Sequence, residues 1–153
     1  MENILNRSNH NPMERFNHIE LENISLVVQH LIELLPRYPF IALEGEMGSG
    51  KTTLTVALLK ALGILEPEGS PTFSLIQPYD LPNDKVLYHL DAYRINSDEE
   101  ALMIGLDELF EEDAYFIVEW PEKIINFLPK QRMILTIENT GFNQRNYSIE
   151  YGE

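Results

Sequence analysis

The 153-residue sequence contains no cysteine, which excludes disulfide frameworks, thiolate nucleophiles and cysteine-based zinc sites. Its four histidines lack the spacing of metal ligands: His10, His18, His30 and His89. No apolar run approaches the roughly 18 residues that span a bilayer, and the polar, asparagine-rich start lacks the layout of a signal peptide. These absences predict a soluble, cytoplasmic protein that makes no membrane contact.

Positive charge is also scarce, because 11 Lys and Arg face 25 Asp and Glu, which gives a formal net charge of −14. Proteins that bind nucleic acid by themselves depend on Lys and Arg contacts to phosphates, so direct binding of nucleic acid is not expected. With 44% hydrophobic and 24% charged residues, the composition is that of a globular chain. A negatively charged ligand must therefore be held by a local arrangement that overcomes the field of the whole protein.

Apolar patterning predicts alternating strands and helices over most of the chain. We expect a flexible tail over residues 1–15 and a single domain over residues 16–153. Strands are predicted at 16–21, 40–43, 73–79, 86–91, 115–119, 133–137 and 147–151. Helices are predicted at 24–35, 53–62, 98–110 and 121–128, with Ser97 as an N-cap. Such alternation predicts an α/β sandwich around a mixed sheet.

A phosphate-binding pattern lies between a predicted strand and a predicted helix. The segment from Gly45 to Thr52 matches G-x-x-x-x-G-K-[ST] in full. Its glycines let successive N–H groups point into one concavity, at the N-terminus of the helix that follows. We expect Lys51 to reach the β- and γ-phosphates and the Thr52 hydroxyl to bind Mg²⁺. The residues predicted to bind the nucleotide here are Glu46, Met47, Gly48, Ser49, Gly50, Lys51, Thr52 and Thr53.

Two predicted strands end in acidic residues that can complete such a site. Asp91 can hold Mg²⁺ directly or through water, and Glu119 can orient or deprotonate an attacking water or share the metal. The alternative for Asp91 is a helix-cap or turn residue, and the alternative for Glu119 is an ordinary strand-end acid. Thr72 lies in Ser-Pro-Thr-Phe, where nucleotide switches keep a threonine that touches Mg²⁺. Trp120, the sole tryptophan, is either a packing residue or a ligand contact beside Glu119.

The order of the motifs carries more information than any one of them. They are Gly45-x-Met-Gly-Ser-Gly-Lys-Thr-Thr53, Ser70-Pro-Thr-Phe-Ser74, His89-x-Asp-x-Tyr-Arg94, Gly105-Leu-Asp-Glu108 and Glu119-Trp-Pro-Glu122. Over about Phe40 to Glu122 this series resembles the TsaE family, the small bacterial P-loop ATPases of tRNA threonylcarbamoyladenosine synthesis. The N-terminal tail has no match to the family.

The resemblance implies a three-layer, P-loop NTPase-like sandwich with a mostly parallel central sheet, and ATP with Mg²⁺ as cofactors. It implies TsaD and TsaB as partners, with tRNA met only indirectly through that complex, whose turnover the ATPase drives. Hydrolysis would be weak for the isolated chain. By this resemblance Lys51, Asp91 and Glu119 are catalytic, and Thr52, Asp91 and Glu119 bind the metal. Thr72 is the switch residue, and Trp120 is a functionally important neighbour.

Two alternatives remain open. A small-molecule kinase needs several cations around the phosphates, whereas only Arg94, Arg132 and Arg145 follow as arginines after Lys51. A nucleotide-dependent binding switch with negligible turnover would suit Thr72 and an acidic cluster, which is otherwise a solvated helix face. That cluster consists of Asp107, Glu108, Glu111, Glu112 and Asp113. The absence of an Asn/Thr-Lys-x-Asp motif disfavours a GTPase.

Overall fold

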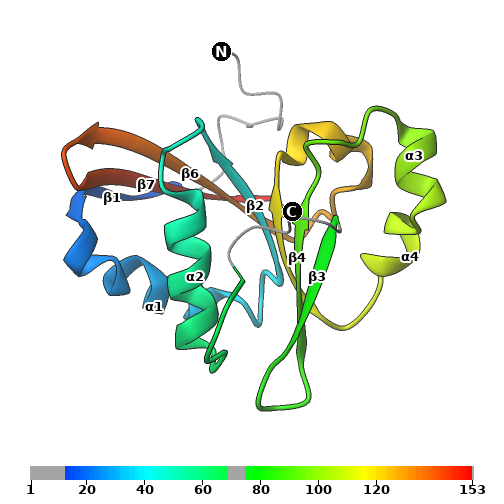
Figure 1. Ribbon diagram of the computed structural model, residues 1–153, viewed down its shortest axis with the longest axis horizontal. Coiled ribbons are helices and arrows are strands. Elements are labelled where there is room, and N and C mark those ends of the chain that lie inside the picture. The colour runs from blue at the N-terminus through cyan, green and yellow to red at the C-terminus, as the bar shows by residue number, and fades with distance from the viewer. Residues whose placement is uncertain (1–12, 69–74, 153) are drawn as a thin grey trace.

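The computed structural model describes residues 13–68 and 75–152 (Figure 1). The predicted tail, residues 1–15, falls mostly on residues 1–12, outside this part of the chain. Met13 to Arg15 already belong to the first strand, so regular structure begins three residues earlier than the sequence indicated. The switch residue Thr72 also lies outside the described residues.

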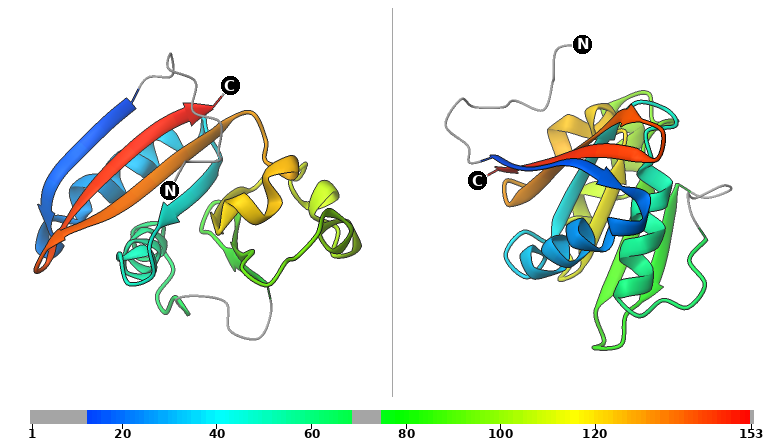
Figure 2. Two further views of the ribbon diagram at one scale, coloured as in Figure 1. Left: turned by 90° about the horizontal axis from the view of Figure 1, so that it is seen from above. Right: turned by 90° about the vertical axis from the view of Figure 1, so that its left-hand side faces the viewer.

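In the described part of the chain, a seven-stranded mixed sheet has the order β1-β7-β6-β2-β5-β4-β3. Its strands are β1 Met13–Glu20, β2 Phe40–Gly45, β3 Ile76–Asp80, β4 Val86–Asp91, β5 Tyr115–Glu119, β6 Arg132–Gly141 and β7 Gln144–Gly152. Strand β2 pairs in parallel with β5 and β6, and β4 pairs in parallel with β5. The hairpins β3–β4 and β6–β7 and the pair β1–β7 are antiparallel (Figure 2). The predicted mixed sheet is confirmed, with its parallel strands at the centre.

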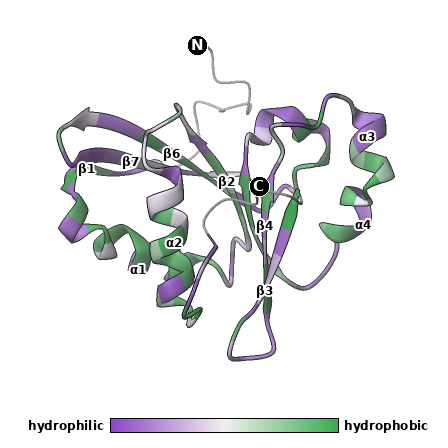
Figure 3. Cartoon of the chain, in the orientation of Figure 1, coloured by the Kyte–Doolittle hydropathy of each residue, from purple (hydrophilic) through white to green (hydrophobic). Residues whose placement is uncertain are grey.

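Helices cover both faces of this sheet. The helices are α1 Ser25–Leu34, α2 Lys51–Ala61, α3 Asp98–Met103 and α4 Leu106–Leu109, with 3₁₀ helices η1 Leu21–Asn23 and η2 Pro121–Phe127. Because successive strand residues point to opposite faces, Ile41 and Leu43 pack in one apolar cluster with α1 and α2. Phe40 and Ala42 pack in a second cluster with α3, α4 and η2. The two clusters confirm the three-layer arrangement, and Figure 3 shows hydrophobic residues along α1 and α2.

The helical region after Ser97 differs from its prediction. The expected single helix over 98–110 is wrong, because Gly105 adopts a left-handed conformation with φ of 80° and separates α3 from α4. The predicted cap is confirmed, since Ser97 Oγ accepts a hydrogen bond from Glu100 N at 3.2 Å. Among the described residues, no helix combines the length and apolar character needed to cross a membrane.

Candidate active site

The predicted site residues gather where the central parallel strands end. In register, Leu43 of β2 lies opposite Glu119 of β5, and Glu119 lies opposite Asp91 of β4. Parallel strands present their carboxyl ends at one edge of a sheet, where α/β proteins bind their ligands. The loop from β2 to α2 therefore meets both strand-end acids at this edge.

This phosphate loop is closed by its own backbone and by a neighbouring side chain. Ser49 N donates to the Glu46 carbonyl at 3.0 Å, which forms a tight turn. Gly50 then adopts φ of 109°, and an added Cβ would lie 3.4 Å from Arg145 Nε. Helix α2 follows at once, and its N-cap residue Gly50 makes no side-chain cap bond. The N–H groups of a first helical turn are donors suited to an anionic ligand.

A pocket of about 360 Å³ opens beside the loop, within the size range of small-molecule sites. Its lining consists of Met47, Gly48, Gly50, Lys51, Thr52, Thr53, Glu119, Trp120 and Arg145. The Lys51 ammonium lies 4.7 Å from the centre of the Trp120 ring, a cation–π contact. The cationic and aromatic groups of the pocket are thus already in contact.

Trp120 occupies an uncommon backbone conformation. Its φ of 56° and ψ of 50° are left-handed, and Pro121 follows directly. Bulky residues rarely adopt this region, and a following proline further disfavours helical angles. The Trp120 ring also packs on Tyr93, with centroids 5.0 Å apart. Backbone strain therefore lies in the lining of the pocket, as is frequent at functional sites.

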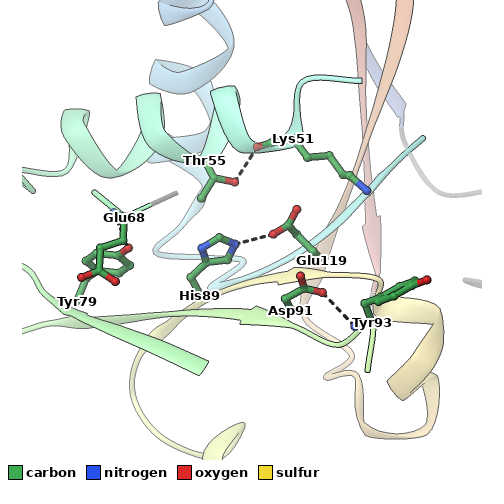
Figure 4. Close-up of polar contacts among 8 residues, drawn as sticks. All are labelled: Lys51, Thr55, Glu68, Tyr79, His89, Asp91, Tyr93 and Glu119. Atoms are coloured by element: carbon green, nitrogen blue, oxygen red, sulfur yellow. Dashed lines mark hydrogen bonds and ion pairs between the residues drawn. The ribbon is translucent and has the colours of Figure 1, made fainter. Parts of the chain in front are cut away.

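Glu119 is held from below by a buried histidine. His89 Nε2 lies 2.9 Å from Glu119 Oε2, and their side chains are 0% and 6% exposed. Figure 4 shows this pair beneath α2, with Lys51 extending over the carboxylates of Glu119 and Asp91. Separating such a buried pair would leave a charge desolvated, so the contact is expected to persist. His89 therefore orients Glu119, the one carboxylate that the described residues contribute to the pocket lining.

Asp91 lies beside the pocket rather than in its lining. Its Oδ1 accepts a hydrogen bond from Tyr93 N at 3.0 Å, which turns the chain at the end of β4. Ala92 N donates to the Glu119 carbonyl at 3.0 Å and joins the two strand ends. Asp91 is thus half-buried and next to Glu119.

The structure brings most of the predicted residues together, while their roles stay predictions. In the pocket lining are the predicted Met47, Gly48, Gly50, Lys51, Thr52, Thr53, Glu119 and Trp120. Glu46 is exposed at the turn, and Ser49 is buried behind the loop. Neither of them lines the pocket.

Two residues were missed as site components. His89 had a usable signal, because it precedes Asp91 by two positions on a strand and so shares its face. Arg145 had none, because it is far from the loop in sequence and reaches it only through the order of the strands in the sheet.

The donor set fits a nucleotide with Mg²⁺. Within residues 13–68 and 75–152, no cluster of three or more His, Asp or Glu side chains forms a ready-made metal site. Mg²⁺ is commonly held by one or two carboxylates together with substrate phosphates, so such a cluster is not required. Thr52, Asp91 and Glu119 are the residues placed to hold it beside phosphates at the start of α2.

Comparison with known proteins gives consistent matches. The family model for "Threonylcarbamoyl adenosine biosynthesis protein TsaE" matches residues 19–147. The chain is 41% identical over 107 residues to the tRNA threonylcarbamoyladenosine biosynthesis protein TsaE of Bacillus subtilis, covering 69% of this chain and 65% of that protein. Its counterpart in Treponema pallidum is 30% identical over 116 residues, covering 76% and 84%.

The match with the Haemophilus influenzae protein of the same name is 35% identical over 98 residues, covering 64% of this chain and 61% of that protein. The matched region thus spans less than two thirds of the B. subtilis and H. influenzae proteins. Among solved structures, Bacillus subtilis YdiB superimposes with a TM-score of 0.72 at 27% identity, covering 95% of this chain and 90% of that one. This likeness confirms the predicted fold class.

Proposed function

This chain belongs to the TsaE family, and on that premise we propose that it is a Mg²⁺-dependent ATPase that supports tRNA threonylcarbamoyladenosine biosynthesis in the cytoplasm. One observation carries the proposal. Lys51, Thr52 and Glu119 converge on a single pocket at the N-terminus of α2. That combination supplies a cation, a hydroxyl and a carboxylate around the place where a triphosphate would lie.

The residues divide the work of binding and hydrolysis. Lys51 and the loop N–H groups would hold the phosphates, and Thr52 and Asp91 would hold Mg²⁺, which would neutralise phosphate charge. Glu119 orients the attacking water and accepts its proton. His89 keeps the Glu119 carboxylate in place through their 2.9 Å contact. Trp120 closes the pocket and contacts Lys51.

We further propose that hydrolysis is slow in the isolated chain and is coupled to a complex of TsaD and TsaB. The formal charge of −14 supports an indirect encounter with tRNA, because a chain this acidic is repelled by phosphate backbones. Within the described part of the chain, the pocket lining contains only two cations, Lys51 and Arg145. This shortage argues against phosphoryl transfer to an anionic acceptor, and hence against a kinase.

The test is Mg²⁺-dependent ATP hydrolysis, measured for the chain alone and mixed with the TsaB–TsaD pair. We expect little turnover alone and about a hundredfold more in the mixture, the lower end of one residue's contribution to general acid–base catalysis. A rate unaffected by the pair would rule out partner coupling. Nucleotide binding is followed separately through the fluorescence of Trp120, the sole tryptophan.

Variants separate hydrolysis from binding. Glu119→Gln should abolish turnover and leave MgATP binding within a few-fold, whereas Lys51→Ala should weaken binding. Glu122→Gln is the matched control, because it makes the same charge change three residues away and outside the pocket lining. If Glu119→Gln stopped hydrolysis but tRNA modification continued at the normal rate, the protein would be a binding switch and the ATPase proposal would be wrong.

A further inference from the structure

Arg145 links the phosphate loop to the C-terminal hairpin β6–β7. Its Nε donates a hydrogen bond of 2.6 Å to the Ser49 carbonyl, a contact between residues 96 positions apart in the chain. The guanidinium also packs against Gly50, where an added Cβ would lie 3.4 Å from Nε. The hairpin thus contacts the loop at the peptide between Ser49 and Gly50, directly before α2 begins.

The guanidinium is held rigidly on its other side. Nη1 donates to the Gln144 carbonyl at 2.8 Å, the Asn139 side chain at 3.1 Å and the Gly141 carbonyl at 3.3 Å. These acceptors all belong to the hairpin itself. Because Nη1 has two N–H groups for three acceptors, both of its N–H groups are already used in hydrogen bonds.

The remaining amino group is uncommitted. Nη2 carries two N–H donors and makes no hydrogen bond to any residue that the structure describes. Arg145 nevertheless lines the pocket together with Lys51, Thr52 and Glu119. A fixed guanidinium with a vacant edge beside a phosphate loop matches the planar geometry with which arginine recognises phosphate.

The contact with Ser49 has a second effect on the loop. In a trans peptide the C=O and N–H bonds point in opposite directions. By holding the Ser49 carbonyl, Arg145 also fixes the direction of the Gly50 N–H, which belongs to the same peptide unit. The orientation of one loop donor therefore depends on a side chain of β7.

We propose that Arg145 is a second phosphate-binding cation of this site, which positions the loop through Nε and offers Nη2 to a phosphate oxygen of the bound nucleotide. This inference rests on the proposed nucleotide-binding function and adds a residue to it. Lys51 supplies a flexible point charge, whereas Arg145 supplies a planar donor pair fixed by the hairpin.

The experiment compares Arg145→Ala, Arg145→Gln and Arg145→Lys with the wild-type chain by calorimetric titration with MgATP, tripolyphosphate and adenosine. Arg15→Gln is the matched control, because it removes the same charge from an exposed position on β1. We expect Arg145→Ala and Arg145→Gln to lower the affinity for MgATP and for tripolyphosphate about tenfold or more, and to leave the affinity for adenosine unchanged. The affinity of Arg145→Lys should lie between that of the wild type and that of Arg145→Ala. One ammonium retains the charge but cannot bond to the loop and to the ligand together.

Each result decides the inference. Wild-type affinity in all three variants would overturn it, as would a loss for MgATP with no loss for tripolyphosphate. If Arg145→Gln bound MgATP and tripolyphosphate with wild-type affinity, Arg145 would act only by positioning the loop, and its role as a second phosphate-binding cation would be refuted. Circular dichroism of each variant reports folding, and Arg145→Lys remains informative if Arg145→Ala does not fold. If the wild-type chain bound MgATP without hydrolysing it, only the ATPase proposal would be wrong. If the wild-type chain did not bind MgATP, both the ATPase proposal and the proposed role of Arg145 would be wrong.

Discussion

Removing His89 should be one of the most costly single substitutions in the protein. Its side chain is fully buried, and its partner Glu119 is nearly so. In His89→Ala the carboxylate loses this partner and a cavity is left in its place. Breaking a buried pair from one side costs about 3–5 kcal/mol, because the remaining charge stays desolvated. Urea denaturation followed by far-UV circular dichroism measures the free energy of unfolding.

The protein contains its own control for this prediction. His30 contacts Glu14, but these side chains are 28% and 40% exposed. Water can replace the lost contact there, so His30→Ala should cost at most about 1 kcal/mol. The same chemical deletion is thus compared at a buried His–Glu pair and at a partly exposed one.

Further variants identify the cause of the loss. His89→Gln keeps a side-chain donor for Glu119 and should recover part of the stability. In His89→Ala/Glu119→Gln the buried carboxylate charge is gone as well, so the double variant should cost less than the sum of its single changes. Equal losses for His89→Ala and His30→Ala, or strict additivity in the double variant, would refute the reasoning from burial.

Three other predictions concern the backbone, a helix cap and pH. Gly50→Ala should destabilise the protein by about 1–2 kcal/mol in thermal unfolding and weaken MgATP binding, because the φ of Gly50 is 109° and Arg145 lies against it. Gly105→Ala is the control, since Gly105 has a φ of 80° but open space around it. It should cost a similar amount of stability and leave MgATP binding unchanged. Ser97→Ala should cost about 0.5–2 kcal/mol in urea denaturation because α3 loses its cap, whereas Ser25→Ala at the start of α1 should cost little since no side-chain cap bond exists there. Burial is the main cause that raises the pKa of Tyr151 in the folded protein, and its hydrogen bond to Glu14 is the second. The contribution of Tyr151 to stability is therefore complete below the unfolded pKa of about 10 and falls as pH rises above it. Tyr151→Phe should therefore flatten the alkaline decline in urea denaturation midpoints measured from pH 8 to 11, and an unchanged decline would assign it to other groups.

The central part of the fold could be predicted from local sequence. The apolar runs that become β4 and β5 end in Asp91 and Glu119, and the strands have the predicted bounds. Parallel strands whose two faces are both covered appear in the sequence as continuous apolar runs. The loop from Gly45 to Thr52 was recognisable because its glycines, lysine and threonine have a fixed spacing.

Features that depend on tertiary contacts could not be predicted in this way. The apolar spacing of 98–110 fits a single helix, and only the left-handed backbone at Gly105 divides it. Strand β1 begins at Met13 because β7 offers it a pairing edge, which local propensity does not reveal. Arg145 joins the pocket through the same long-range arrangement of strands.

The pairing of β1 with β7 also bears on how the chain acquires its structure during synthesis. Met13 lies opposite Glu150, so β1 has no pairing partner until β7 emerges from the ribosome. The core strands β2, β4 and β5 have all been made by residue 119, and long-range pairing of this kind is slow. A nascent chain that has not yet extended past β6 lacks Arg145 and exposes the unpaired edge of β6. The lining of the pocket is therefore completed together with closure of the sheet, once β7 with its Arg145 has been made.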